Sequence, residues 1–177
     1  NDTDIKKTRN TSLKFKNKPL ISILIPVYNP PIDFLKDAID SVVNQAYQNW
    51  EICLADDNSP NKEIRNLIKD YSKNDKRIKY IFRKKNGHIC EATNSALAIA
   101  SGEYVALLDH DDILWPNALF EIVQSLQKNP DTDLFYSDED KLMGDGKTHT
   151  DPFFKPDWSP DYLHSINYIT HLAVLKT

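Results

Sequence analysis

From residue 20 onward, short runs of large apolar residues alternate with longer segments whose apolar residues recur at helical spacing. The first run, residues 20–26 (LISILIP), is almost wholly apolar, which is typical of a strand buried on both faces. After Pro30 and Pro31, apolar residues return every three or four positions, the period of a helix. The strands expected from this pattern are residues 20–26, 51–55, 78–82, 104–108 and 134–136. The helices expected between them begin near Pro31, Ile64, Glu91 and Pro116.

This order, in which a helix follows each of the first four strands, shows no internal repeat. It predicts a doubly wound α/β sheet with mainly parallel strands, because each crossover helix carries the chain back to the edge where the previous strand began. We expect residues 20–177 to form one domain of this kind. Residues 1–19 are polar, and every charge between Lys6 and Lys18 is positive. We expect this segment to be a flexible lead-in, with a basic arm that touches acidic lipid as the alternative.

Composition excludes several classes of protein. Lysine and arginine total 22 against 26 aspartate and glutamate, a net charge of −4, whereas general nucleic-acid binding needs a basic surplus. The four glycines form neither a GxGxxG fingerprint nor a P-loop. Two cysteines, Cys53 and Cys90, are too few for a disulfide framework or a cysteine-rich zinc site, so we expect a reduced, cytoplasmic chain. No apolar run is long enough to span a bilayer.

Acidic residues follow three of the expected strands. Asp56 and Asp57 come after the second strand, residues 109–112 (DHDD) after the fourth and residues 138–140 (DED) after the fifth. The carboxyl ends of parallel strands meet at one edge of a sheet, where α/β proteins bind ligands. Carboxylates gathered there repel one another unless a cation compensates, and oxygen ligands suit Mg²⁺ or Mn²⁺. Because the sequence has no glycine loop for a diphosphate, a bound metal ion is the expected means of neutralising one.

Each acidic cluster also has a purely structural explanation. The cluster after the second strand is good turn chemistry, and Asp112 is placed to cap the helix that follows. For Asp109 and Asp111, spaced as Asp-x-Asp at a strand end, we favour a role in binding a metal ion or a nucleotide. His110 between them is expected to be an exposed spacer rather than a ligand. Residues 138–140 are about as compatible with a solvated loop as with a substrate contact.

Several motifs occur in a specific order along the chain. They are residues 23–29 (ILIPVYN), 56–59 (DDNS), 86–87 (NG), Asn94 and 108–112 (LDHDD). Together they resemble the family 2 glycosyltransferases, which have the GT-A fold, a Rossmann-like fold of nucleotide-diphospho-sugar transferases. The resemblance runs from about residue 20 to the end of the chain. Residues 136–141 (YSDEDK) and 151–160 (DPFFKPDWSP) resemble the bacterial members that build O-antigen, capsule or other surface polysaccharides.

The resemblance implies roles for individual residues. Pro26 and Tyr28 would lie beside the nucleotide base, with Tyr28 able to stack on it and Asp57 able to accept a hydrogen bond from it. Asp109 would hold the ribose or a metal-bound water, and Asp111 would bind the metal ion directly. The nucleotide-binding set implied is Pro26, Tyr28, Asp57, Arg83, Asn86, Asn94 and Asp109. The catalytic residues implied are Asp109 and Asp111, acting with Mn²⁺ or Mg²⁺ on the departing nucleoside diphosphate.

The sequence departs from the family pattern at two points. Family members usually carry the general base in an acidic motif well beyond Asp-x-Asp, after a Gly-Gly-Phe-like turn, and this chain shows no such motif. We therefore expect a chain truncated on its acceptor side, with Asp138, Glu139 or Asp140 as the in-chain candidates for the base. The usual Gly-Gly pair is replaced by Gly87 and His88, which leaves the contact with the diphosphate open at that position.

The activity implied is transfer of a sugar from a nucleotide-diphosphate donor, UDP-linked or similar, to a saccharide or lipid-linked acceptor in cell-surface polysaccharide synthesis, with inversion. One alternative is a nucleotide-sugar-binding module without turnover. Another is a haloacid-dehalogenase-like phosphatase, whose Asp-x-Asp should end the first strand rather than the fourth. The third, a phosphoacceptor receiver domain, needs a lysine that the fifth strand lacks. We expect no nucleic-acid partner, and a cytoplasmic protein that lies at the inner face of the membrane if it binds lipid.

Overall fold

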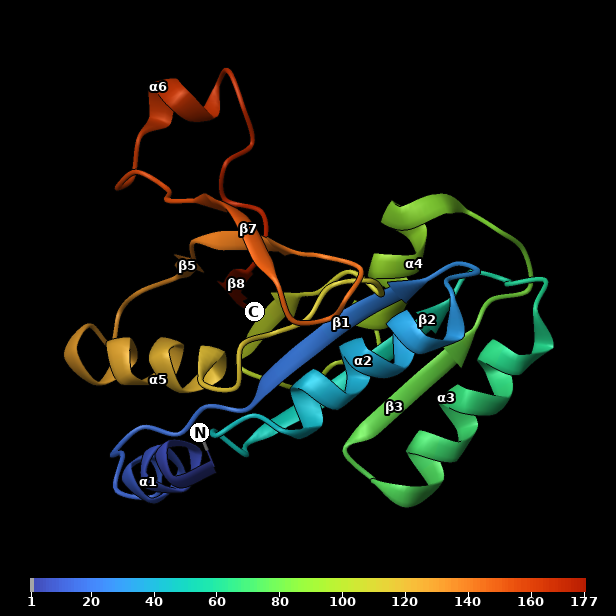
Figure 1. The fold of residues 1–177 in the computed structure, drawn as a ribbon, viewed down its shortest axis with the longest axis horizontal. Helices are drawn as coiled ribbons and strands as arrows, with labels where there is room; N and C mark the ends of the chain where they lie inside the picture. Colours follow the sequence, from blue (N-terminus) through green and yellow to red (C-terminus); the bar gives the residue numbers. More distant parts are fainter. Residues whose placement is uncertain (1) are drawn as a thin grey trace.

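The structure, a computed structural model, describes residues 2–177. Its centre is a six-stranded sheet in the order β3-β2-β1-β4-β8-β5 (Figure 1). The strands are β1 (Ile21–Val27), β2 (Trp50–Asp56), β3 (Ile78–Phe82), β4 (Tyr104–Leu107), β5 (Leu134–Tyr136) and β8 (Ala173–Lys176). Strands β1 to β4 pair in parallel, and β5 runs in the same direction because β8 is antiparallel to both β4 and β5. The predicted doubly wound, mainly parallel sheet is confirmed.

Strand β1 is the central strand from which the sheet extends in both directions. The chain adds β2 and β3 on one side of β1 and then crosses back to place β4 on the other side. The strand order therefore reverses between β1 and β4, the point at which doubly wound sheets bind ligands. In β1 and β2 every residue is buried except the half-buried Pro26, as expected for strands covered on both faces.

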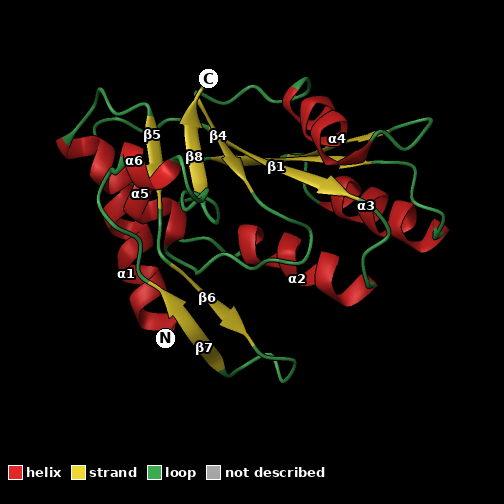
Figure 2. Ribbon diagram, turned by 90° about the horizontal axis from the view of Figure 1, so that it is seen from above, coloured by secondary structure: helices red, strands yellow, loops and turns green. Residues whose placement is uncertain are grey.

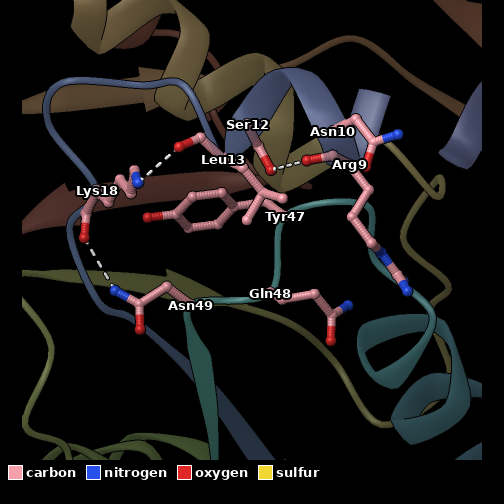
Figure 3. A pocket seen from close by; sticks show the side chains of 8 residues that line it. All are labelled: Arg9, Asn10, Ser12, Leu13, Lys18, Tyr47, Gln48 and Asn49. Carbon is pink, nitrogen blue, oxygen red and sulfur yellow. Dashed lines mark hydrogen bonds between the residues drawn. The ribbon is translucent and has the colours of Figure 1, made fainter. Parts of the chain in front are cut away.

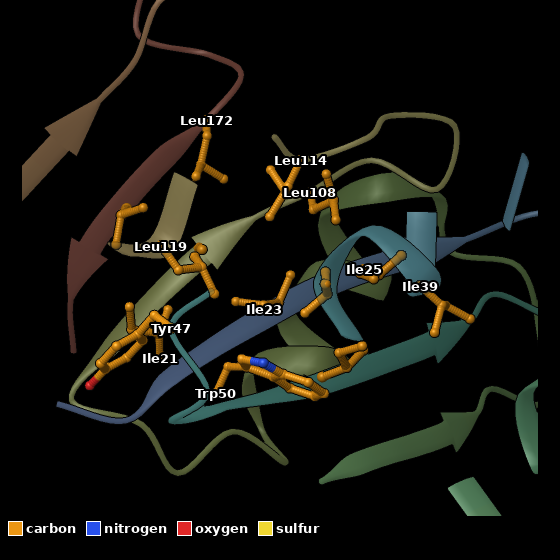
Figure 4. Close-up of a cluster of buried hydrophobic side chains, with 14 of the residues drawn as sticks. Ile21, Ile23, Ile25, Ile39, Tyr47, Trp50, Leu108, Leu114, Leu119 and Leu172 are labelled. Atoms are coloured by element: carbon orange, nitrogen blue, oxygen red, sulfur yellow. The ribbon is translucent and has the colours of Figure 1, made fainter. Parts of the chain in front are cut away.

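Helices cover both faces of the sheet, as Figure 2 shows from above. They are α2 (Ile32–Val43), α3 (Lys62–Asn74), α4 (His88–Leu97) and α5 (Ala118–Lys128). On one face, α2, α3 and α5 enclose the larger core, in which Ile21, Ile23 and Ile25 of β1 lie among buried side chains (Figure 4). On the other face, Ala92 and Ala96 of α4 pack on the sheet, and their small side chains let the helix lie close to it.

Two side chains in these helices differ from their expected positions. The sequence predicts that Phe34 of α2, at helical spacing among apolar residues, and Cys90 of α4 pack inward, but both are exposed. Each lies close to a buried residue of the same helix, Leu35 in α2 and Ala92 in α4, so the exposed side chains lie on another side of the helix. Within residues 2–177, no helix combines the length and the apolar composition that crossing a bilayer requires.

The first segment, which the sequence predicts to be a flexible lead-in, contains a helix. Residues Asp2–Ser12 form helix α1, and the residues after it pack on α5. The rings of Phe15 and Phe120 are stacked, with centroids 5.2 Å apart. The side chain of Gln127 accepts a hydrogen bond from the backbone nitrogen of Asn17 at 3.1 Å and donates one to its carbonyl oxygen at 2.8 Å. The segment has few apolar residues, so its hydrophobic pattern gives no sign of this packing.

The region after β5 contains elements that the sequence pattern does not predict. Part of the acidic cluster 138–140 belongs to a hairpin of β6 (Glu139–Leu142) and β7 (His149–Phe153), which forms a sheet of its own. A short helix, α6 (Pro160–Leu163), follows at the upper left of Figure 1. Strand β8 then inserts between β4 and β5. The place of β8 in the sheet depends on contacts with distant parts of the chain, which the local sequence pattern does not show.

A buried carboxylate lies at the edge of the sheet where β1 and β2 begin. Glu51, 5% exposed, accepts hydrogen bonds from Ser22 Oγ at 2.7 Å and from Ser101 N at 2.6 Å, and lies 2.7 Å from Lys79 Nζ. Burial alone would raise the pKa of Glu51, but the hydrogen bonds from Lys79, Ser22 and Ser101 outweigh it and hold the pKa below its ordinary value. Gly102 completes this corner by donating its N–H to Ser22 Oγ at 2.8 Å.

Gly102→Ala should lower the free energy of unfolding. The added Cβ would lie 2.6 Å from the carbonyl oxygen of Leu20 and 2.7 Å from Ser22 Oγ, closer than carbon and oxygen atoms approach without a shift of the backbone or side chain. Overpacking of this kind costs about 1–3 kcal/mol. Gly144→Ala is the matched control, since no heavy atom lies within 4 Å of its added carbon; its effect should stay below about 0.5 kcal/mol. Urea unfolding measures both, and equal losses in the two variants would contradict the packing at Gly102.

The Glu51 carboxylate should make stability depend on pH. Because the folded pKa lies below the unfolded value of about 4.3, the charge stabilises the fold above about pH 4.3. That stabilisation is lost as the pH falls through the folded pKa. The advantage of wild type over Glu51→Gln should therefore be largest near neutral pH and shrink below about pH 4. Denaturant unfolding of both proteins across this range measures it, and an advantage that does not change with pH would rule out the charge as its source.

Candidate functional site

The loops at the carboxyl ends of β1 to β4 lie at one edge of the sheet, and the segment before β8 joins them. Because β8 is antiparallel to β4, the amino end of β8 comes to this edge. Asp109 and Asp112, from the loop after β4, therefore meet His171, which lies two residues before β8. The antiparallel strand is thus the reason that a residue from the end of the chain reaches the acidic loop.

Asp109, Asp112 and His171 form a compact group of possible metal ligands. Each offers one donor atom, and these atoms all lie within 4.8 Å of one another. Asp112 Oδ2 and His171 Nδ1 are 2.9 Å apart. Burial raises the pKa of Asp112 above its ordinary value; His171 opposes this rise, while the neighbouring carboxylates of Asp109 and Asp111 add to it. Negative charge is thus concentrated at this point, and a bound cation would relieve the repulsion.

Two carboxylates and one imidazole are a donor set that fits a divalent metal ion. Only part of this group was predicted. Asp109 belongs to it, but Asp111, predicted to bind the metal ion directly, is exposed and is not one of the three residues. The role of Asp111 stays a prediction. Asp112, interpreted from the sequence as a helix cap, pairs with His171. The sequence could identify His171 as this partner only if the direction of β8 were already known.

His110 holds the acidic loop against the first strand. Its Nδ1 lies 3.1 Å from the carbonyl oxygen of Pro26, near the end of β1. The backbone adds a second connection, since Leu108 N donates to the carbonyl oxygen of Leu24 at 3.1 Å. His110 is therefore a half-buried contact between the acidic loop and β1, rather than the exposed spacer that the sequence suggests.

Asp57 and Arg83 form a buried ion pair at the ends of β2 and β3. Asp57 is 1% exposed, and each of its carboxylate oxygens accepts from Gly87 N at 3.0 Å. Arg83 Nε lies 2.7 Å from Asp57 Oδ1, although its N–H has no aligned hydrogen-bond acceptor. Arg83 Nη1 donates to Glu91 O and to Ser95 Oγ, both at 2.6 Å. The pair holds the loop between β3 and α4 in place and leaves Asp57 only part of its four lone pairs for a ligand.

Gly87 is required by the closeness of its neighbours. A Cβ at this position would lie 2.5 Å from Arg83 Nη2 and 2.9 Å from Glu91 Cβ. The next residue, His88, has a φ of 65°, in the left-handed region that favours glycine. His88, which replaces the second glycine of the family's Gly-Gly pair, thus has a backbone conformation that suits glycine.

The other predicted nucleotide contacts lie at the same edge of the sheet. Tyr28 follows β1 and is 51% exposed, and Asn86 and Asn94 are exposed on the loop after β3 and on α4. Their predicted roles stay predictions. Asp56, in contrast, is fully buried and accepts from Ser59 N at 3.1 Å and from Arg65 Nε at 2.8 Å. The turn-forming interpretation of Asp56 is therefore correct.

The acidic residues 138–140 are each engaged with another part of the hairpin region. Asp138 Oδ1 accepts from Lys155 N at 2.8 Å, and Glu139 Oε2 lies 3.3 Å from Lys155 Nζ. Asp140 Oδ2 lies 3.0 Å from His149 Nδ1. These contacts hold β6, β7 and the following segment together. The role of Asp138 or Glu139 as general base stays a prediction.

A hollow of about 330 Å³ lies at the other end of the molecule, between α1 and the start of β2 (Figure 3). Two of its polar side chains are already bonded within the protein. Lys18 Nζ donates to the carbonyl oxygen of Leu13 at 2.8 Å, and Tyr47 OH donates to that of Pro19 at 2.7 Å. No carboxylate lines this hollow, so it offers no second candidate metal site like the one at Asp109 and Asp112.

Comparison with known proteins agrees with this arrangement. The model of glycosyl transferase family 2 matches residues 22–175. The chain is 49% identical over 161 residues to the uncharacterized protein y4gI of Sinorhizobium fredii, and 35% identical over 163 residues to the O-antigen biosynthesis protein RfbC of Myxococcus xanthus. These matches cover 91% and 92% of the chain but 18% and 13% of the relatives. The chain thus spans less than a fifth of the length of either relative.

A solved structure supports the same assignment at the level of the fold. The mannosyltransferase PcManGT from Pyrobaculum calidifontis, in complex with GDP-Man and Mn²⁺, superposes with a TM-score of 0.60 and 19% sequence identity. The superposition covers 76% of this chain and 42% of that one. The expected GT-A architecture is confirmed by this likeness and by the order of the sheet. With a family model that matches nearly its whole length, the chain belongs to glycosyl transferase family 2.

Proposed function

We propose that this chain is the donor-binding domain of a glycosyltransferase that builds a cell-surface polysaccharide. It would bind a nucleotide-diphosphate sugar together with a divalent metal ion and transfer the sugar, with inversion, to a saccharide or lipid-linked acceptor. The observation that carries the proposal is the meeting of Asp109, Asp112 and His171 beside the switch point between β1 and β4. Ligands of doubly wound sheets bind at this point.

The donor set supports Mn²⁺ as the metal ion. Carboxylate oxygens suit both Mg²⁺ and Mn²⁺, but an imidazole nitrogen favours the transition metal. PcManGT, which has a similar fold, binds Mn²⁺ in its solved complex. A metal ion held by Asp109, Asp112 and His171 would supply positive charge beside the diphosphate, where negative charge grows as the glycosidic bond breaks. Asp111, exposed in the same loop, is the further ligand that the sequence predicts.

The protein's own residues would share the binding of the donor. Asp57 and Arg83 fix the loop before α4, and this loop would carry the nucleotide or its diphosphate. Tyr28, exposed where β1 ends, has a ring face available for stacking on the base. Asn86 and Asn94 would donate hydrogen bonds to phosphate oxygens from the loop and from α4.

The choice of polysaccharide synthesis rests on a relative. RfbC is an O-antigen biosynthesis protein and shares 35% of the aligned residues, but the chain spans 13% of it, so the acceptor is part of the proposal. The GDP-Man complex of PcManGT and the predicted UDP-linked donor both favour a nucleotide-diphosphate sugar. Asp138 and Glu139, both engaged with Lys155, stay the proposed candidates for the general base. Action in the cytoplasm, at the inner face of the membrane, stays a prediction.

Removing one metal ligand should weaken Mn²⁺ binding. Asp112→Asn and His171→Ala should each weaken Mn²⁺ binding about tenfold or more in the presence of GDP or UDP, because each removes a donor from a set of three. Isothermal titration calorimetry measures the affinity. Asp131→Asn, an exposed carboxylate in the loop before β5, is the control and should bind like wild type.

Asp111→Asn distinguishes the two possible ligand sets in the same experiment. If Asp111→Asn weakens Mn²⁺ binding and Asp112→Asn does not, then the ligand predicted from the sequence is correct and the three-residue group is not the site. If none of the three variants changes the affinity, the acidic loop does not hold the metal ion.

Nucleotide binding should depend on Tyr28 even without metal. Stacking of a base on an aromatic ring contributes about 1–3 kcal/mol, so Tyr28→Ala should weaken the binding of GDP or UDP in EDTA roughly tenfold. Tyr80→Ala removes a partly exposed ring from the outer strand β3 and should leave the affinity unchanged. Equal binding by wild type and Tyr28→Ala would place the base elsewhere. Covalent phosphoryl labelling of the chain would instead support the phosphatase or receiver alternative.

A further inference from the structure

Lys155 is a buried lysine in the segment between β7 and α6, within the motif of residues 151–160. Its side chain is 1% exposed, although lysine is almost never fully buried unless it is paired. An ammonium group can donate three hydrogen bonds, and three acceptors surround this one. They are Glu139 Oε2 at 3.3 Å, the carbonyl oxygen of His171 at 2.8 Å and the carbonyl oxygen of Thr170. The full donor capacity of the group is thus used to join the hairpin to the segment before β8.

The backbone on both sides of these contacts is fixed as well. Lys155 N donates to Asp138 Oδ1 at 2.8 Å, which anchors the lysine to the residue after Ser137. Ser137 N donates to the carbonyl oxygen of Leu172 at 3.2 Å, and Leu172 N donates to Ser137 Oγ at 3.2 Å. Hydrogen bonds at the carbonyl oxygen of Thr170, at that of His171 and at the backbone of Leu172 therefore fix the position of His171.

The conformation of His171 needs such support. Its φ is 53°, in the left-handed region that residues other than glycine adopt rarely and keep only when their surroundings hold them there. In this conformation the ring lies 2.9 Å from Asp112 and within the group that includes Asp109. Loss of the support would let the segment relax and carry the imidazole away from the two carboxylates.

We infer that Lys155 is a positioning residue for the metal site: its ammonium group holds the carbonyl oxygens of Thr170 and His171 and thereby places the His171 imidazole beside Asp109 and Asp112. This inference rests on the proposed function of that site. Charge alone predicts the opposite effect, because a buried positive charge repels a nearby cation. If the lysine acts by positioning His171, its removal should weaken Mn²⁺ binding. If it acts only through its charge, its removal should strengthen Mn²⁺ binding.

The test is the Mn²⁺ affinity of the 177-residue chain, measured by calorimetry with GDP or UDP present. Lys155→Met removes all three donors at similar volume. Because loss of a residue that orients a ligand typically weakens metal affinity 10- to 100-fold, we expect a loss of about that size. If the lysine acts only through its charge, the variant should bind Mn²⁺ more tightly than wild type. Unchanged or tighter binding would overturn the inference.

A double variant shows whether the effect passes through His171. In a His171→Ala background, Lys155→Met should cause no further loss of Mn²⁺ affinity, because the ligand that it positions is already absent. A further loss of the same size would mean that the lysine acts on the fold as a whole. Lys79→Met is the matched control, since Lys79 pairs with buried Glu51 at the opposite edge of the sheet. It should lower the unfolding temperature and leave the Mn²⁺ affinity unchanged.

Lys155→Gln is a milder substitution that keeps the inference testable if Lys155→Met does not fold. It keeps a neutral amide with two N–H donors on a shorter side chain and should weaken Mn²⁺ binding in the same direction by a smaller factor. Circular dichroism verifies that each variant is folded, and failure of both variants to fold would replace the inference with a purely structural role. Failure of wild type to bind Mn²⁺ would overturn the proposed metal site as well. Binding by wild type and equally by the Lys155 variants would overturn this inference alone.

Discussion

Strand β1 is hydrogen-bonded along both of its edges, to β2 on one side and to β4 on the other. Buried backbone groups have to be paired, so an apolar strand covered by helices on both faces needs two neighbours. The chain can supply both only by extending the sheet in one direction and then returning to the other side. That return creates the switch point, and the acidic loop after β4 begins there. The position of the candidate site follows from the burial of one strand.

The carboxylates of this domain are distinguished by the donors around them. Asp56, Asp57 and Glu51 are almost fully buried, and each is surrounded by hydrogen-bond donors or by a cationic side chain from its own fold. Asp112 pairs with His171; burial raises the pKa of Asp112, and the neighbouring carboxylates of Asp109 and Asp111 add to the rise. The first kind stabilises loops and strands without needing a ligand. The negative charge of Asp112 and its neighbouring carboxylates needs added positive charge to offset it, which is why we place the metal ion there.

The motif of residues 151–160 gains a physical explanation from the fold. The sequence pattern resembles that of surface-polysaccharide enzymes but does not say what its lysine does. In the structure, Lys155 joins the β6–β7 hairpin to the segment that leads into β8. Because that segment carries His171, a contact made far from the acidic loop in the sequence affects the geometry of the loop's partner. The buried ammonium group therefore connects the hairpin to the candidate site, in addition to the stacking of His149 in β7 on Trp115 in the loop after β4.

The sequence by itself determined the order of the first five strands and four helices, and it placed residues 109–112 at the ligand-binding edge. Apolar periodicity and the edge reached by a parallel strand are local properties, so no long-range information was needed. Only the tertiary structure decided that residues 2–12 form a helix and that the segment behind it packs on α5, that β8 runs antiparallel between β4 and β5, and that His171 pairs with Asp112. These features depend on contacts between residues far apart in the chain. Short or polar segments encode such contacts in no pattern of their own.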